Sequence, residues 1–368
     1  MGNNKSNVFI ICTGLGHINR GYETFTMECF NALKTSPDFE LFLLKGAGRS
    51  YEKEFTILCA KRNTKLARFL AKIIRKGTYW IEQFTFLIGM LPYLIKYKPK
   101  VIYYSDFILG TFLFHLRSFF KFKYKLLFSN GAPNGPPYKT EDHIQQLLTI
   151  YAKEAIEKGT PPDKQTLLPY GFDININERL LATKGKDTIR EALGFAPEQK
   201  IILSVGAINK HHKRMDYLIN EVAKLPANYF LVILGQFEDE TEELLNLAAG
   251  KLNGRHLITS IPSEEVKNYY IASDFFVLAS LKEGFGRVLI EALSYGLPCI
   301  VNNHANAIGV LGEYGEFIDM EGEGVLATTL LSEKSSFSKE QRIEASYNLY
   351  SWDRLKEKYA AMITKLID

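Results

Sequence analysis

Two glutamates, Glu283 and Glu291, stand eight positions apart around a Gly-Phe-Gly turn in LKEGFGRVLIEALSYG. The preceding run FFVLAS predicts a buried strand, and RVLIEALSYG predicts a helix. The amide groups at the start of that helix, from about residue 286 to residue 288, favour an anion. Carboxylates make strong hydrogen bonds to hydroxyl groups. The stretch therefore predicts a pocket that holds polyols on either side of a diphosphate, which is the layout of a nucleotide sugar.

The same stretch, EGFGRVLIEALSYGLPCIV, resembles the E-x7-E signature of the retaining glycosyltransferases of family 4, which adopt the GT-B fold. Three further stretches resemble that family in the same order along the chain: LPYGFD at 168–173, SVGAINKHHKRMDYLI at 204–219, and the C-terminal YNLYSWDRLKEKYAAMI. The resemblance runs from about residue 165 to the end of the chain and is weak before it.

The resemblance implies roles for individual residues. Glu283 is expected to contact the donor sugar and Lys213 the diphosphate, and these two are the expected catalytic residues. Glu291 is expected to hold the ribose. The residues expected to approach the sugar and the phosphate through their backbone are Gly284, Phe285, Gly286, Arg287 and Val288.

One position departs from the family pattern. The family has an arginine after Val-Gly, and this chain has Ala207 there. A leaving diphosphate needs positive charge, and the loss of one such partner costs on the order of 3 kcal/mol. Four basic or histidine side chains lie close to Ala207 in the sequence, and they either substitute for the missing arginine or form a solvated basic loop. They are Lys210, His211, His212 and Arg214.

The first part of the chain offers a glycine loop, in FIICTGLGHINRG. Gly14 and Gly16 let this loop approach a ligand. His17 either orients substrate hydroxyls or is a hydrogen-bonded turn histidine. Asn130 stands where the family often has a histidine, and His143 is predicted to lie on the surface of a helix.

Short apolar runs separated by amphipathic stretches predict parallel strands covered by helices, and hence an α/β fold. The runs are NVFIIC, ELFLLK, VIYYS, KLLFSN, KIILSVG, YFLVILG, HLITSI, FFVLAS and PCIVNN. We expect two Rossmann-like domains, an acceptor-side domain over 1–168 and a nucleotide-sugar domain over 169–345. The resemblance implies that their sheets face a central cleft and that a helix in 346–368 packs back on the first domain.

Basic residues are concentrated in the first part of the chain. Residues 1–150 carry 21 Lys and Arg against 10 Asp and Glu, and residues 61–76 alone carry seven cations and no acid. The helical spacing within this segment forms an apolar stripe, which consists of Leu66, Phe69, Leu70, Ile73 and Ile74. Two interpretations stand: the stripe packs on its own sheet, or the helix lies on an anionic membrane.

The overall composition indicates a protein of the cytoplasm, with a peripheral position on the inner face of a membrane as the alternative. The four cysteines show no zinc-type pairing, so no disulfide and no metal site are expected. No leader pattern is seen at the start, and the longest apolar stretch is too short to span a bilayer. No nucleic-acid-binding module is recognised.

The resemblance to family 4 implies a retaining, metal-independent and cofactor-free glycosyltransferase that moves a sugar from a UDP-hexose to an acceptor hydroxyl with an α-linkage. The acceptor is a glycan, a lipid or a small molecule. The alternatives are a catalytically inactive nucleotide-sugar-binding or scaffold protein, which Ala207 favours, and an epimerase of the GT-B fold.

Overall fold

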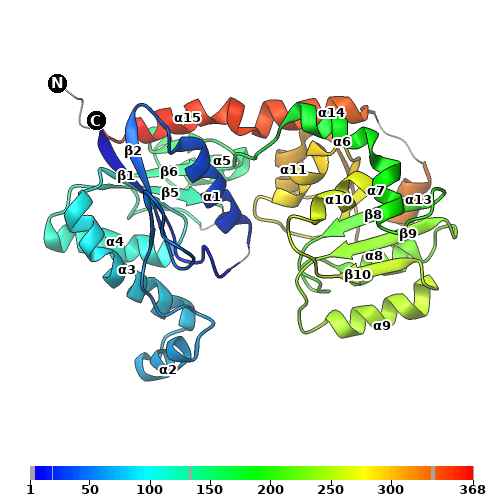
Figure 1. Cartoon of the computed structure of the whole chain (residues 1–368), viewed down its shortest axis with the longest axis horizontal. Helices are drawn as coiled ribbons and strands as arrows, with labels where there is room; N and C mark the ends of the chain where they lie inside the picture. The colour runs from blue at the N-terminus through cyan, green and yellow to red at the C-terminus, as the bar shows by residue number, and fades with distance from the viewer. Residues whose placement is uncertain (1–4, 19, 132–134, 333–335, 368) are drawn as a thin grey trace. The chain divides into compact units, whose positions relative to one another are not determined.

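The computed structural model describes residues 5–18, 20–131, 135–332 and 336–367 of the 368-residue chain. The chain forms two compact units, which we describe separately (Figure 1). The first consists of Met1–Asp173 with Trp352–Asp368, and the second of Ile174–Ser351. The divisions thus fall after residues 173 and 351, and those predicted from the sequence fall after residues 168 and 345.

The first unit is built on a seven-stranded parallel sheet in the order β3-β2-β1-β4-β5-β6-β7. The strand order reverses between β1 and β4. The strands are β1 (Ser6–Cys12), β2 (Phe39–Lys45), β3 (Glu54–Thr56), β4 (Val101–Tyr104), β5 (Lys125–Asn130), β6 (His143–Gln146) and β7 (Gln165–Leu167).

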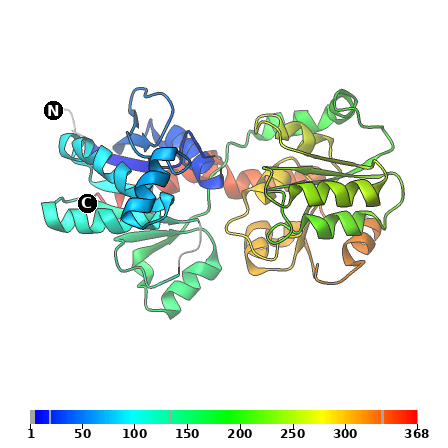
Figure 2. The ribbon, with the colours of Figure 1, turned by 90° about the horizontal axis from the view of Figure 1, so that it is seen from below.

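Helices cover both faces of this sheet, because alternate residues of each strand point to opposite faces. Phe9 and Ile11 of β1 pack with α3 (Thr78–Tyr97) and α4 (Phe107–Phe120). On the other face lie α1 (Gly21–Leu33) and, beside it, α15 (Trp352–Thr364) (Figure 2). The remaining helices of this unit are α2 (Lys65–Ile74) and α5 (Thr149–Glu157).

The C-terminal helix α15 is part of the first unit. The Trp352 amide donates to the Phe172 carbonyl at 3.0 Å. The Tyr359 hydroxyl donates to the Pro169 carbonyl at 2.7 Å and accepts from Gln145 Nε2 at 2.7 Å. These bonds tie the end of the chain to residues far upstream.

The second unit has a six-stranded parallel sheet in the order β10-β9-β8-β11-β12-β13. Its strands are β8 (Lys200–Val205), β9 (Tyr229–Leu234), β10 (His256–Thr259), β11 (Phe275–Leu278), β12 (Cys299–Asn302) and β13 (Gly315–Ile318). One face packs on α8 (Met215–Val222), α9 (Thr241–Leu252) and α13 (Val325–Ser332). The other helices are α6 (Ile176–Lys184), α7 (Lys186–Ala192), α10 (Val266–Ala272), α11 (Arg287–Ser294), α12 (Ala305–Leu311) and α14 (Lys339–Tyr350).

The predicted α/β class and each apolar run predicted to be a strand are confirmed. Four short strands, β3, β6, β7 and β13, were not predicted. The prediction for His143 is wrong, because this residue begins the buried strand β6 and does not lie on a helix surface.

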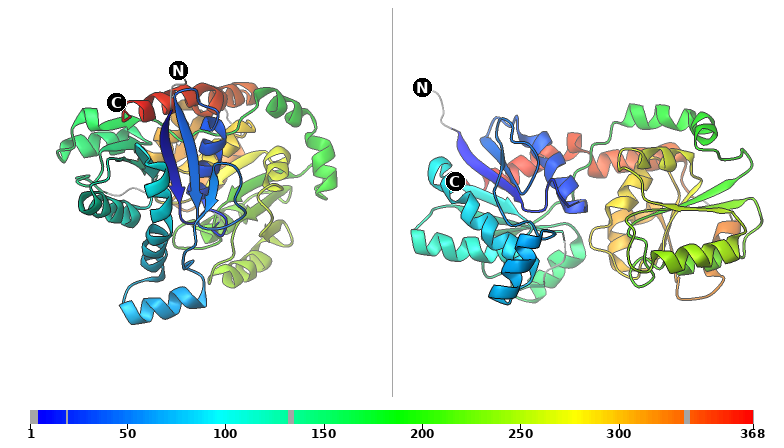
Figure 3. Two further views of the ribbon diagram at one scale, coloured as in Figure 1. Left: turned by 60° about the vertical axis from the view of Figure 1, so that its left-hand side comes forward. Right: turned by 60° about the horizontal axis from the view of Figure 1, so that its bottom comes forward.

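The basic helix predicted within 61–76 forms α2, which projects from the sheet of the first unit (Figure 3). The interpretation in which its whole apolar stripe packs on that sheet is wrong, because Leu66, Phe69 and Ile73 are exposed. The longest apolar stretch lies in α3, which continues through Pro92.

Among the described residues, no helix combines the length and the apolar character that crossing a membrane requires.

Candidate functional site

The second sheet reverses its strand order between β8 and β11. In open parallel sheets, ligands bind beyond the carboxyl ends of the strands at such a switch point. The loops that follow these two strands, residues 206–214 and 279–286, contain most of the residues predicted to hold the donor. The switch point of the second unit is therefore the first place to look for a site.

Lys213 and Glu283, the two expected catalytic residues, form an ion pair across this switch point, between Lys213 Nζ and Glu283 Oε1. Their side chains are only 11% and 9% exposed. The Asn209 carboxamide fixes the loop that carries the lysine, because its oxygen accepts from the Lys213 amide at 2.8 Å and from the His212 amide at 3.1 Å. A cation and a carboxylate are thus held together beyond the carboxyl ends of the two central strands.

A glycine makes room for the lysine. A Cβ atom at Gly206 would lie 3.0 Å from Lys213 Cε, and one at Gly235 would lie 1.6 Å from the Gly206 carbonyl oxygen. The ends of β8 and β9 therefore approach each other too closely for larger residues. The sequence reasoning did not identify this use of Gly206 and Gly235.

Asn306 supports the loop that carries Glu283, and His304 lies near this glutamate; both residues were missed from the sequence. The Asn306 side chain donates to the carbonyl oxygens of Glu283 and, at 2.9 Å, of Gly284. His304 caps α12 by accepting from the Ala307 amide at 3.2 Å. Burial lowers the pKa of His304, while the neighbouring Glu283 acts in the opposite direction. His304 is therefore a neutral acceptor beside the ion pair.

The helix α11 begins at Arg287, as the sequence predicted, and Gly286 caps it in the left-handed conformation with φ of +73°. Because glycine has no side chain, no side-chain cap occupies the amide groups of the first turn. The Phe285 ring is buried and packs edge-on against Tyr350 at 6.3 Å. The side chain of Phe285 is therefore part of the packing of this unit, and Val288 follows in the first turn of the helix.

Glu291 is oriented by a tyrosine from α10. The Tyr270 hydroxyl donates to Glu291 Oε2 at 3.0 Å, and Arg287 Nε lies 4.0 Å from Glu291 Oε1. Burial, and then the glutamate charge, raise the pKa of Tyr270 well above its ordinary value, so the hydroxyl keeps its proton. Glu291 is thus a fixed carboxylate in the second turn of α11.

The candidate substitutes for the missing arginine at Ala207 bind elsewhere. Lys210 pairs with Glu243. His211 Nε2 lies 2.7 Å from Glu240 Oε1. The other two bind carbonyl oxygens, His212 that of Lys282 at 3.0 Å and Arg214 that of Met320 at 2.9 Å. Each of the four is thus engaged with another part of the second unit.

The first sheet has its own switch point, between β1 and β4, where a polar network lies. Thr13 donates to Asp106 Oδ2 at 3.0 Å, and the Tyr79 hydroxyl donates to Asp106 Oδ1 at 2.6 Å. Gln83 Nε2 donates to Thr13 Oγ1 at 2.6 Å. Tyr79 and Gln83 come from α3, and the sequence reasoning missed both, together with Asp106.

His17 is linked to this network through the buried acid Glu82 and through Arg62, whose guanidinium lies 4.6 Å from the centre of the Tyr79 ring. His17 Nε2 lies 2.8 Å from Glu82 Oε1, and Glu82 is fully buried. Arg62 donates to the same carboxylate from Nε at 2.6 Å and from its backbone amide at 2.9 Å. Because a carboxylate held by an arginine only accepts, His17 Nε2 donates to Glu82. Within the described residues, the buried Nδ1 atom has no hydrogen-bond partner.

The glycines of the first loop are required by the packing of the chain itself. A Cβ atom at Gly14 would lie 2.3 Å from Glu23 Oε1. Gly16 has φ of +93°, and a Cβ atom there would lie 2.4 Å from the Ala47 carbonyl oxygen. Their predicted approach to a ligand stays a prediction, because packing alone accounts for both.

Asn130 and His143 are engaged in the first sheet. Asn130 Nδ2 donates to the Tyr138 hydroxyl and to Gln146 Oε1, both at 2.9 Å. His143 Nε2 lies 2.8 Å from Thr166 Oγ1, and burial lowers the pKa of His143 to about 4. Neither residue joins the polar network around His17.

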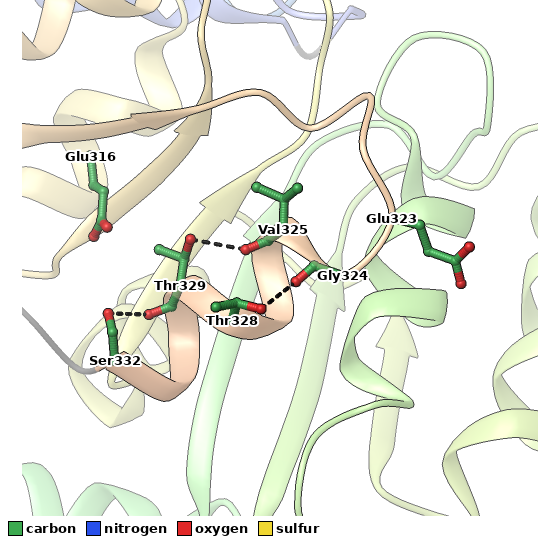
Figure 4. Close-up of a pocket in the computed structure, with 7 residues that line it drawn as sticks. All are labelled: Glu316, Glu323, Gly324, Val325, Thr328, Thr329 and Ser332. Carbon is green, nitrogen blue, oxygen red and sulfur yellow. Dashed lines mark hydrogen bonds between the residues drawn. The ribbon is translucent and has the colours of Figure 1, made fainter.

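A shallow hollow of about 500 Å³ lies along α13, away from the predicted residues (Figure 4). Its hydroxyl groups bond back to their own helix: Thr328 donates to the Gly324 carbonyl, Thr329 to that of Val325 and Ser332 to that of Thr329. These hydroxyl groups are therefore occupied within the helix. The described residues also contain no cluster of His, Cys, Asp or Glu that could hold a metal ion.

Comparison with known proteins places the second unit in context. Residues 185–327 match the model of the family described as "Glycosyl transferases group 1". An uncharacterized glycosyltransferase of Methanocaldococcus jannaschii is 30% identical over 155 residues, which are 39% of this chain and 38% of that protein. The N-acetylgalactosamine-N,N'-diacetylbacillosaminyl-diphospho-undecaprenol 4-alpha-N-acetylgalactosaminyltransferase of Campylobacter jejuni is 28% identical over 167 residues, 44% of this chain and 45% of that enzyme. The chain thus spans less than half the length of these relatives.

A solved structure matches both units. The Anabaena protein HepE, in complex with UDP and glucose, gives a TM-score of 0.73 at 14% identity over 98% of this chain and 100% of that one. The two Rossmann-like units with parallel sheets confirm the GT-B fold. The family match supports the group 1 glycosyltransferase superfamily, and the matched segment includes Lys213, Glu283 and Glu291.

Proposed function

We propose that this protein is a retaining glycosyltransferase that moves a hexose from a UDP-hexose to an acceptor hydroxyl and leaves an α-linkage. The observation that carries the proposal is the ion pair of Lys213 with Glu283 at the carboxyl ends of β8 and β11, next to the N-terminus of α11. The spacing of Glu283 and Glu291, typical of family 4, supports the assignment.

The chemistry of the pair fits a sugar joined to a phosphate. Glu283 can accept hydrogen bonds from sugar hydroxyls, and Lys213 can neutralise phosphate oxygens. Because the two groups are within hydrogen-bond distance of each other, they suit a ligand in which hydroxyl and phosphate are neighbours. The first amides of α11 would add positive potential for the diphosphate, and Glu291 would hold the ribose hydroxyls.

The proposed step needs no metal and no nucleophile from the protein. The acceptor oxygen attacks the anomeric carbon on the face from which the diphosphate leaves. The bond from that carbon to the phosphate oxygen breaks, and the departing diphosphate takes the acceptor proton. Lys213 and the start of α11 stabilise the negative charge that develops on the diphosphate. The products are the α-glycoside and UDP.

The first unit would supply the acceptor side through His17. Glu82 holds its ring, and its Nδ1 atom has no hydrogen-bond partner within the described residues. We propose that the loop that carries His17 binds the acceptor and orients its hydroxyl group. A glycan, a lipid and a small molecule all carry such a group. The Campylobacter relative has a diphospho-undecaprenol in its name, which favours a lipid-linked acceptor.

A screen of nucleotides tests the donor assignment. A ligand at 100 times its dissociation constant stabilises the folded protein by about 2.7 kcal/mol, so UDP and the preferred UDP-hexose should raise the melting temperature and GDP-mannose should not. Glu291→Gln should weaken UDP binding. The anomeric configuration of the product, read by NMR, then tests retention. A β-linked product from an α-linked donor would exclude it.

A second candidate, a nucleotide-sugar binder without turnover, is favoured by Ala207 and by the engagement of its cationic neighbours. Such a protein would bind UDP-hexose but release no UDP, either to water or to an acceptor. The variant Ala207→Arg separates the candidates further. It should raise the turnover of a weak transferase, by up to about 100-fold, and should leave a pure binder inactive.

A further inference from the structure

The helix α2 consists of three adjoining strips of different chemistry. Consecutive residues of an α-helix are turned by about 100°, so residues at i, i+3 and i+7 share a strip, and the next strip begins one residue later. The side chains of the first strip are cationic, and those of the second are large and apolar. Those of the third are also apolar, and the first of them is a small alanine. Their members are Lys65, Arg68 and Lys72; Leu66, Phe69 and Ile73; and Ala67, Leu70 and Ile74.

Of the three strips, only the third packs against the protein, through Ala67 and Leu70, while Ile74 at its end is 43% exposed. Ala67 is buried with Ala60 and Ile81, and Leu70 packs against this cluster. Leu66, Phe69 and Ile73 are 58%, 61% and 62% exposed. Large apolar side chains exposed side by side mark an interaction surface. The exposed apolar strip lies between the packed strip and the cationic one.

The surroundings of this strip are strongly cationic. Residues 55–81 contain no acid, and 61–76 contain seven Lys and Arg. Within the described residues, no ion pair joins Lys65, Arg68 or Lys72 to an acid. A partner that covers the strip must therefore tolerate positive charge along one border, and an anionic surface would be attracted to it.

The helix is formed before any partner binds. Thr64 caps its start by accepting from the Ala67 amide at 3.2 Å. Its end is closed by Arg75 in the left-handed conformation and by the Lys76 amide, which donates to the Ala71 carbonyl at 3.1 Å. The surface therefore requires no folding step upon contact.

We propose that α2 docks the protein on an anionic lipid bilayer. The strip of Leu66, Phe69 and Ile73 enters the boundary between headgroups and acyl chains, and the cationic strip lies against lipid phosphates. Nucleic acid would satisfy the cations but leave the apolar strip uncovered. The proposal does not depend on transferase activity.

Vesicle co-sedimentation of the full chain tests the proposal. The protein should bind vesicles of phosphatidylcholine with phosphatidylglycerol, bind phosphatidylcholine alone far more weakly, and be released by salt. Arg68→Glu with Lys72→Glu, and separately Phe69→Gln with Ile73→Gln, should each weaken binding by at least about tenfold. The matched control, Leu181→Gln with Lys251→Glu, alters an apolar residue that is 69% exposed and a surface cation in the second unit and should bind like the wild type. Circular dichroism verifies that each variant is folded.

Insertion is measured separately by fluorescence. Phe69→Trp should be quenched by lipids brominated on their acyl chains, and Leu181→Trp should not. Equal binding by wild type and both α2 variants, or no quenching of Phe69→Trp, would overturn the proposal. So would two other results: a dimer in the absence of lipid that Phe69→Gln with Ile73→Gln dissociates, which would identify a second copy as the partner, or RNA binding that depends on the cations but not on the apolar strip.

Discussion

The switch points of the two sheets occupy equivalent places in similar folds, yet their side chains differ in organisation. In the first unit, the ends of β1 and β4 carry a buried network in which each acid has at least two partners. In the second unit, the ends of β8 and β11 are joined by the Lys213–Glu283 ion pair, beside a glycine-capped helix. The order of the strands thus determines where each of these polar clusters lies. The side chains contributed by the surrounding loops and helices determine whether the cluster is a buried network or a pair of charges.

Breaking the ion pair should have the largest effect. Lys213→Met and Glu283→Gln are each expected to lower turnover by about 100-fold to 1000-fold, because each removes charge from the reacting groups. Each should also destabilise the second unit, by about 3 kcal/mol, since it leaves one nearly buried charge without its partner. Steady-state kinetics and denaturant unfolding measure the two effects.

The double variant Lys213→Met with Glu283→Gln is the control for stability. It removes both charges, so it should recover most of the lost free energy of unfolding and none of the activity. A double variant with wild-type turnover would show that the pair is structural.

Weakening the network of the first unit should have a smaller effect on turnover. Glu82→Gln removes the charge that faces the His17 ring and Arg62, and we expect turnover to fall by about 10-fold to 100-fold with unchanged UDP affinity. Glu141→Gln alters another buried acid of the same unit, bonded to Thr140, and should not change turnover. Equal losses of UDP affinity and turnover in Glu82→Gln would contradict an acceptor-side role for His17.

Loosening the glutamate loop should have a moderate effect. Asn306→Ala removes the donor to the carbonyl groups of Glu283 and Gly284, which should weaken donor binding by about tenfold, the equivalent of one lost hydrogen bond. Asn302→Ala is a matched control, because Asn302 Oδ1 accepts from the Met320 amide outside this loop. Calorimetric titration with UDP-hexose distinguishes the two variants.

The smallest effect concerns stability and pH in the first unit. The pKa of His143 is about 4 in the fold against 6.5 for a free histidine, so the unfolded chain binds more protons between these values. His143 therefore lowers stability as the pH falls from 6.5 toward 4 and has no such effect above 6.5. His143→Gln should flatten this part of the stability curve, measured by urea unfolding at a series of pH values. Parallel curves for variant and wild type would contradict the assignment.

The donor side was accessible from the sequence because its parts are close together in the chain. A strand, a glycine turn and a helix follow one another in 275–294, so Glu283, Gly286 and Glu291 could be placed on their elements directly. Lys213 was found through the resemblance. Residues that reach the site from other elements, such as Tyr270 and Asn306, leave no local pattern, and the sequence reasoning missed them.

The first unit was harder to predict for the same reason. Its network joins a loop after β1, a residue after β4 and a helix between them. Two signals were available: Glu82 and Gln83 interrupt an otherwise apolar stretch of α3, and Asp106 closely follows a buried strand. The strand β6 was missed because its sequence HIQQ is polar, although hydrogen bonds within the sheet satisfy its side chains.

The path of the chain has a consequence for truncation. The second unit is inserted into the sequence of the first unit. The chain leaves the first unit after Asp173 and returns to it at Trp352, and the hydrogen bond between Trp352 and Phe172 holds these two crossing points together. A stop codon at position 352 would remove α15 from the first unit, including Tyr359, which binds Gln145. It would also expose the aromatic face of α1. Such a shortened protein would lose stability in the first unit, although the truncation is at the other end of the chain. The sheet of the second unit, which carries Lys213 and Glu283 at its strand ends, would retain all of its strands.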